Sequence, residues 1–268
     1  MKTTNLFSTT LMERDIRANL ALTLVITLIM ILMSTIVNYA MSVMTAPAFS
    51  RADPTVFLNK IYFTVIGLLP IFIYIVVVAN ALIAGQVDSG ALAYVLSTPI
   101  RRRAVALTHI VYLLLMPLLM IGLVCLSRIL STKLFFGEVC APRVVMLYAG
   151  MYLLVEAVTA ICFLGSCLFD LSRRSLAFGG GFTVWFFLAS LLGMFGAEDM
   201  VEMGMGVEQL GVFNQLTLIG LFDINRISTI GTENVDLAFV PKLCALAAVA
   251  LVCYIAGTLR FDRKDLPI

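Results

Sequence analysis

The sequence predicts an all-α membrane protein with six transmembrane helices, and three observations lead to this fold class. Of 268 residues, 61% are hydrophobic and 13% are charged, with a mean hydropathy of +1.04, whereas soluble domains are about 45–50% apolar and about 25% charged. The apolar residues form long blocks, each sufficient for the roughly 20 residues that cross a bilayer. The polar segments between them are mostly short. These figures exclude a water-soluble globule and leave no room for a second, soluble domain.

Six apolar blocks are bounded by charges or by turns that contain Gly or Pro. They cover residues 19–45, 61–84, 104–127, 144–169, 176–196 and 238–259. An even number of spans places both termini on one side of the membrane. We expect a transmembrane domain over 19–259, an N-terminal segment 1–18 and a tail 260–268.

The basic residues set the expected orientation. Most lie in the segments assigned to the inner side, including Arg101, Arg102 and Arg103 in one loop and Arg173 and Arg174 in another. Because Lys and Arg accumulate in cytoplasmic loops, both termini are expected in the cytoplasm. The sequence therefore predicts a multi-pass membrane protein. We also expect it to lie in the plasma membrane of a bacterium and to retain its first span, because that apolar block is too long for the core of a signal peptide.

The sequence lacks the residue patterns that several classes of protein need. A net charge of +2 spread over many loops makes no basic face for nucleic acid. His109 is the only histidine and no catalytic triad surrounds it in a recognisable order. The six cysteines contain no CxxC pair. We expect no enzyme activity, no metal and no cofactor bound by this chain.

The N-terminal segment 1–18 allows two interpretations. Met12, Ile16 and Leu20 recur at helical spacing with charged residues between them, which is typical of a helix lying along the inner membrane surface. A solvated, charged leader that orients the first span remains the alternative.

The inner loop 85–103 is the most informative segment. Asp88 or Ser89 is suited to cap a helix from about Ala91 to Leu96, Pro99 would end it, and three arginines follow. The pattern predicts a short helix held at the cytoplasmic surface. A plain turn with a topogenic arginine cluster is the alternative.

The same loop resembles the inner-loop signature of type-2 ATP-binding-cassette (ABC) exporter permeases. The matching strings are Ile83-Ala84-Gly85-Gln86, Asp88-Ser89-Gly90-Ala91-Leu92 and Leu96-Ser97-Thr98-Pro99-Ile100-Arg101. Gln86 stands where the family usually has Glu, and Ala91 where it usually has Thr. The ending Phe261-Asp262-Arg263-Lys264-Asp265 is similar to the basic tail of many such subunits.

The resemblance implies a half-transporter that pairs with a second permease, identical or paralogous, within membrane lipids. It also implies two separate cytoplasmic ATPase subunits, which bind ATP and Mg and dock on the inner loop as a coupling helix. The expected roles are apolar contact for Leu92, Tyr94, Val95 and Leu96, charged contact for Asp88 and Arg101, and bends at Gly90 and Pro99. Gln86 completes the expected ATPase-coupling set.

The outer segment 197–237 is acidic, with seven Asp and Glu residues against Arg226 alone. It also contains an apolar run over 212–222, too short to span the membrane but long enough for re-entrant or interfacial helices. An outer gate that helps to expel substrate and a solvated loop are both compatible with this composition.

Three polar residues lie within predicted spans. Glu156 is near the middle of the fourth span, where an ionised carboxylate facing lipid would cost about 2.5–3.5 kcal/mol on insertion scales. It must therefore face protein or water, as part of a translocation cavity or as a structural carboxyl. Asn38 and Asn80 are weaker candidates for the same cavity, since membrane asparagines often join helices.

The expected function is the permease subunit of an ABC exporter that moves a hydrophobic or amphipathic substrate out of the cell, with peptide, lipid and drug cargoes left open. A secondary transporter is one alternative, although such proteins more often show internal repeats. A membrane anchor or assembly protein without transport is the other.

Overall fold

The computed structural model describes residues 7–44, 54–92, 102–196, 206–228, 230 and 237–263. Within these ranges the chain is helical and contains no strand. Six helical stretches are long and apolar enough to cross a membrane, which confirms the predicted number of spans. They are α1 (Thr9–Met44), α2 to α3 (Pro54–Ile61 and Leu68–Leu82), α6 (Arg102–Phe136), α7 (Ala141–Leu168), α8 (Ser172–Phe195) and α12 (Val240–Arg263).

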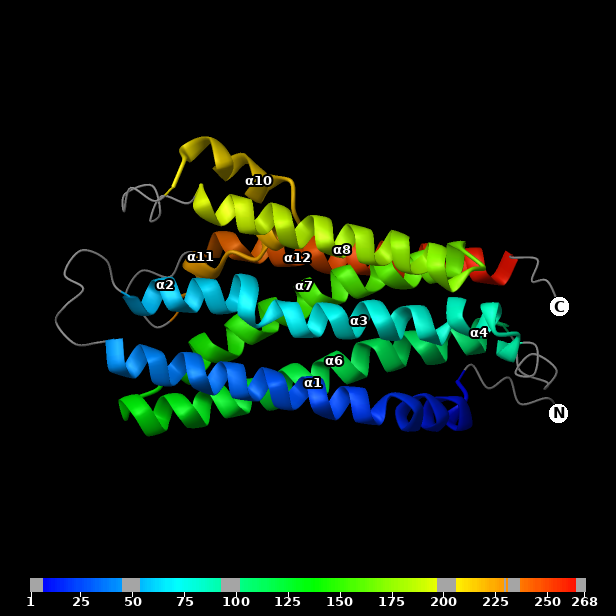
Figure 1. Cartoon of the computed structure of the whole chain (residues 1–268), viewed down its shortest axis with the longest axis horizontal. Coiled ribbons are helices and arrows are strands. Elements are labelled where there is room, and N and C mark those ends of the chain that lie inside the picture. Colours follow the sequence, from blue (N-terminus) through cyan, green and yellow to red (C-terminus); the bar gives the residue numbers. More distant parts are fainter. Residues whose placement is uncertain are drawn as a thin grey trace.

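The six spans lie side by side and alternate in direction along the chain (Figure 1). The start of α1, the end of α12 and the short helix α4 (Ala84–Asp88) lie at one end of the bundle. We call this the inner end, and we call the opposite end, where α1 finishes and α12 starts, the outer end. The even number of spans thus brings both described chain ends to the same end of the bundle, as expected.

Helix α7 is the central element of the bundle, because it packs against α12, α8, α3 and α6. Its contact with α12 is close: a Cβ added to Gly257 of α12 would lie 2.8 Å from Cε1 of Phe163 on α7. Small residues allow membrane helices to approach in this way. By contrast, Leu24, Leu28 and Leu32 on α1 are exposed, as expected of side chains that face lipid.

The second span contains a π-helical turn, η1 (Tyr62–Ile66), between α2 and α3. The N–H of Gly67 donates a 2.7 Å hydrogen bond to the carbonyl of Tyr62, which closes the widened turn. Single π-turns inside helices are frequent at functional sites. Here the turn buries Tyr62, Phe63 and Thr64 in the outer half of the bundle.

Helix α1 begins at Thr9, so residues 9–18 form its first turns and continue directly into the membrane span. The outer segment, for which we expected a re-entrant or interfacial helix pair, consists in its described part of short pieces. These are η2 (Glu208–Gly211), α10 (Val212–Gln215), η3 (Ile219–Leu221) and α11 (Ile224–Ser228), and η4 (Leu237–Phe239) then leads into α12.

Candidate functional site

At the inner end, α4 is attached to the start of α8. The backbone N–H of Ser172 donates to Oδ2 of Asp88 over 3.4 Å, and Nδ2 of Asn80 donates to Oγ of Ser172 over 2.7 Å. Ser172 is the first residue of α8, where backbone N–H groups lack helical partners and favour an anion. Asn80 thus joins α3 to α8, and Asp88 extends the same attachment to α4.

Part of the predicted ATPase-coupling set can be placed. Asp88 and Gly90 are exposed, and Gly90 has a positive φ of 72°, which fits its expected role at a bend. Gln86 is half-buried, whereas Leu92 is only 3% exposed and belongs to the chain's own core. Leu92 therefore offers little apolar surface to another protein. The remaining members lie outside the described residues: Tyr94, Val95, Leu96, Pro99 and Arg101.

A second inner-end contact joins α6 to α12. Nε and Nη2 of Arg103 lie 2.8 and 2.7 Å from Oδ2 of Asp262. Arg103 follows the inner loop directly, and Asp262 belongs to the C-terminal string that resembles the permease tail. Both ends of the inner loop are thus connected to other spans, α8 on one side and α12 on the other.

His109 has a buried acidic neighbour that its sequence position did not reveal. Its Nδ1 lies 2.9 Å from Oδ2 of Asp15 on α1, and the two side chains are 0% and 3% exposed. The approach meets the distance of an ion pair but not the angles of a hydrogen bond. Arg14 also contacts Asp15, with Nη2 2.9 Å from Oδ1. Asp15 is thus buried against α6, whereas its charged neighbours Glu13, Arg14 and Arg17 are exposed.

Glu156 is buried at the centre of the bundle, with 3% of its surface exposed. The Tyr254 hydroxyl donates to its Oε2 over 2.9 Å. Its Oε1 has no hydrogen-bond partner within the described ranges. The carboxyl therefore lies between α7 and α12, away from lipid. It does not line either of the two outer cavities described below, so its place in a translocation cavity stays a prediction.

Asn38 takes part in a polar contact between α1 and α6 in the outer half. Its Nδ2 donates to Oγ of Ser131 over 2.6 Å and to Oγ1 of Thr132 over 3.1 Å. The residue is 1% exposed. These hydrogen bonds join α1 to α6. Asn38 also lines a cavity next to this contact.

Arg128 is the residue that the sequence interpretation missed. It is 5% exposed on α6, and the groups that it contacts are neutral. Nη1 donates to the carbonyl of Ser34 over 3.1 Å, and Nη2 donates to Oδ1 of Asn59 over 2.6 Å. The guanidinium lies 5.1 Å from the centroid of the Tyr62 ring, in the range of a cation–π contact. No carboxylate in the described part of the chain forms an ion pair with Arg128.

A cavity of about 480 Å³ opens beside Arg128 at the outer end. Its polar lining includes Arg143 and Glu138, and its apolar lining includes Phe63 and Leu147. The full lining comprises Asn38, Met41, Asn59, Phe63, Arg128, Thr132, Phe136, Glu138, Cys140, Arg143, Val144 and Leu147. We call it the Arg128 cavity. Its size and mixed lining are those of a small-molecule site.

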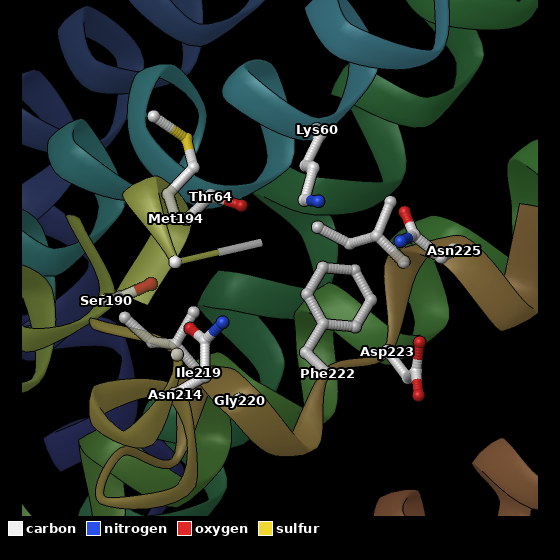
Figure 2. Close-up of a pocket in the computed structure, with 13 residues that line it drawn as sticks. Lys60, Thr64, Ser190, Met194, Asn214, Ile219, Gly220, Phe222, Asp223 and Asn225 are labelled. Carbon is white, nitrogen blue, oxygen red and sulfur yellow. The ribbon is translucent and has the colours of Figure 1, made fainter. Parts of the chain in front are cut away.

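A second cavity, of about 350 Å³, lies between α2, α8 and the outer segment. Figure 2 shows Lys60 directed into it from one side, with Ser190 and Met194 from α8 and Phe222 and Asp223 from the outer segment around it. The π-turn separates the two cavities, since Phe63 lines the first and Thr64 lines the second. The outer segment therefore covers part of the bundle's outer end.

Glycines allow the outer segment to approach the bundle. A Cβ added to Gly150 of α7 would lie 2.7 Å from Cε2 of Phe222 and 3.3 Å from Cδ1 of Ile227. On α8, the carbonyl of Gly193 accepts a 3.1 Å hydrogen bond from Nδ2 of Asn214.

An ion pair also attaches the outer segment to the bundle. Asp223 forms an ion pair of 2.7 Å with Lys242 of α12. Part of the acidity of this segment is thus neutralised by a neighbouring span.

The described residues contain no group of three or more His, Cys, Asp or Glu side chains placed to hold a metal ion. Comparison of the chain with known proteins adds no assignment: no family model matches it, and no curated protein matches it. The function must therefore be argued from the residues and their geometry.

Proposed function

We propose that this chain is the permease subunit of an ATP-driven exporter, powered by separate cytoplasmic ATPase subunits. The observation that carries the proposal is the ordered string over residues 83–101 between the second and third spans. It combines an acidic residue and glycine with Leu96-Ser97-Thr98-Pro99-Ile100-Arg101. The described part of this string lies at the end of the bundle where α1 begins and α12 ends, as a docking loop for a cytoplasmic partner requires.

The contacts of the inner end support a mechanical role for this loop. Asp88 and Asn80 both hold Ser172, so a displacement of α4 is passed to α8 as well as to α3. Arg103 passes a displacement at the other end of the loop to α12 through Asp262. Closure of an ATPase dimer beneath the loop would therefore tilt several spans together, in a rigid-body motion.

In the proposed assembly, two six-helix permeases, identical or paralogous, pair in the plasma membrane of a bacterium. Each binds one ATPase, which supplies the ATP and Mg site. The substrate is hydrophobic or amphipathic and leaves at the outer end, where the described part of segment 197–237 lines the second cavity, of about 350 Å³. This segment would act there as an outer gate, with its short helices as re-entrant or interfacial elements.

The stoichiometry of the complex tests the proposal. The tagged chain is extracted from membranes of its native host in mild detergent and its mass is measured by native mass spectrometry. We expect two permeases with two ATPases. A lone, ATPase-free chain that still transports would contradict it.

One observation favours a second candidate, a proton-coupled secondary transporter. Glu156 is a buried carboxyl in the middle of a span, and its Oε1 has no partner among the described residues. Buried carboxyls of this kind serve as proton relays in such carriers. The same mass measurement separates the two candidates, because a secondary transporter needs no ATPase.

A further inference from the structure

The burial of Arg128 leaves a positive charge without a counterion in the described part of the chain. Its guanidinium donates to two neutral oxygens and to Sδ of Met41, and it lies over the face of Tyr62. Removing an ion from water costs several kcal/mol, and neutral partners return only part of this. Ionisable residues within transmembrane segments commonly pair with one another or with backbone carbonyls, and they often mark a functional site.

The surroundings of Arg128 add further positive potential on the same cavity. Arg143 lines the cavity while its Nε donates to the carbonyl of Ile230 over 2.8 Å. Glu138 is the acidic member of the lining, so two cations face one anion.

The apolar part of the lining indicates what accompanies the anion. Met41, Phe63, Phe136, Val144 and Leu147 contribute to the wall of the cavity. A guanidinium binds phosphate oxygens through paired N–H donors, and the apolar wall suits the start of an acyl chain. The residue pattern is thus complementary to an amphiphile with a phosphate headgroup.

We propose that the Arg128 cavity binds the phosphate headgroup of an anionic phospholipid. This site does not depend on the proposed ATP-driven export, because binding is measured on the full chain without an ATPase. If the chain is also an exporter subunit, anionic phospholipids are then its substrate or a ligand bound from the outer leaflet.

Native mass spectrometry in a neutral detergent tests the proposal. The full chain is titrated with phosphatidylglycerol and with phosphatidylcholine of identical acyl chains. Both lipids present the phosphate, but the choline of phosphatidylcholine brings a positive charge toward Arg128 and Arg143. We therefore expect phosphatidylglycerol to bind about tenfold more tightly. The substitution Arg128→Gln should remove this preference. Lys133→Gln is the matched control, since it removes a charge from the exposed surface of the same helix and should keep the preference.

Three results would overturn the proposal. The first is equal binding of the two lipids by the unmodified chain, and the second is an unchanged preference in Arg128→Gln. The third is binding of soluble glycerol phosphate as tightly as phosphatidylglycerol, which would assign the cavity to a free phosphate ester. If Arg128→Gln does not fold, Arg143→Gln replaces it, with an expected loss of about threefold in phosphatidylglycerol affinity. An unchanged affinity in that variant counts against the proposal.

Discussion

The hydroxyl of Tyr254 donates a 2.9 Å hydrogen bond to Oε2 of Glu156, which joins the middle of α7 to α12. Both side chains are buried, at 6% and 3% exposure. The bond satisfies the tyrosine and one carboxyl oxygen, and it places the carboxyl away from lipid. It also determines how substitutions at this position separate a structural role from a role in transport.

We predict that Glu156→Gln keeps the fold and that Glu156→Leu destabilises it. The amide oxygen of Gln can still accept from Tyr254, so the expected change in unfolding free energy is below about 1 kcal/mol. Leu leaves a buried hydroxyl without an acceptor, at a cost of about 1–3 kcal/mol. Unfolding in mixed detergent measures both changes, and equal stability of the two variants would contradict the importance of the bond.

Cysteine labelling tests whether Glu156 reaches a cavity in any state of the transport cycle. The variant Glu156→Cys is made in a background without the six native thiols. A membrane-impermeant reagent should react with it in at least one nucleotide state. No reaction in any state, together with normal transport by Glu156→Gln and Glu156→Leu, would leave Glu156 as a structural carboxyl.

The pair formed by Asp15 and His109 should contribute to stability as a unit. We predict that Asp15→Ala destabilises the chain by about 1–3 kcal/mol, because it leaves the buried His109 ring without its polar neighbour. A double-mutant cycle with His109→Ala should give a coupling energy of about 1–3 kcal/mol. Glu13→Ala is the control, since its ion pair with Arg17 is exposed and should contribute less than about 1 kcal/mol. Additive effects at Asp15 and His109 would show that their 2.9 Å approach carries no interaction.

The close packing of the outer segment against Gly150 of α7 predicts that a larger side chain at this position destabilises the chain. Gly150→Ala places a methyl group 2.7 Å from the Phe222 ring, which must shift. We expect a loss of about 1–3 kcal/mol from overpacking and faster proteolysis of segment 206–228. Gly122→Ala on α6 is the matched control, because its added Cβ meets nothing within 4 Å. That substitution should be neutral or stabilising by up to about 1 kcal/mol. Equal stability and equal proteolysis rates in the two variants would contradict the contact between Gly150 and Phe222.

The six spans were predictable because each consists of a long apolar block with recognisable ends. Residue 127 was nevertheless too early an end for the third span, since α6 continues to Phe136. The charge of Arg128 suggested a helix end, whereas the structure satisfies it with oxygens from Ser34 and Asn59. One local signal was present: Arg128, Ser131 and Thr132 share one helix face at spacings of three and four residues.

The buried pairs were not predictable, because their members are far apart in the sequence. Asp15 and His109 are brought together only when α1 packs on α6, and Glu156 meets Tyr254 only across the α7–α12 interface. A single sequence gives the chemistry of each residue but not its neighbour. In segment 1–18, the helical spacing of Met12, Ile16 and Leu20 indicated a helix, and the chain is helical from Thr9 as the start of α1.

The proposed coupling is tested most directly by the rate of ATP hydrolysis measured in preparations purified with the chain. Complexes are purified from native-host membranes through a tag on the unmodified chain, on Asp88→Arg and on Glu13→Arg. Asp88 is exposed on α4, and Glu13 is exposed on α1 at the same inner end, so both substitutions reverse one exposed charge. We predict ATP hydrolysis with the unmodified chain and with Glu13→Arg, and a rate at least about tenfold lower with Asp88→Arg. Absence of hydrolysis with the unmodified chain, or equal rates in all three preparations, would contradict the assignment of the inner loop as the site of ATPase coupling.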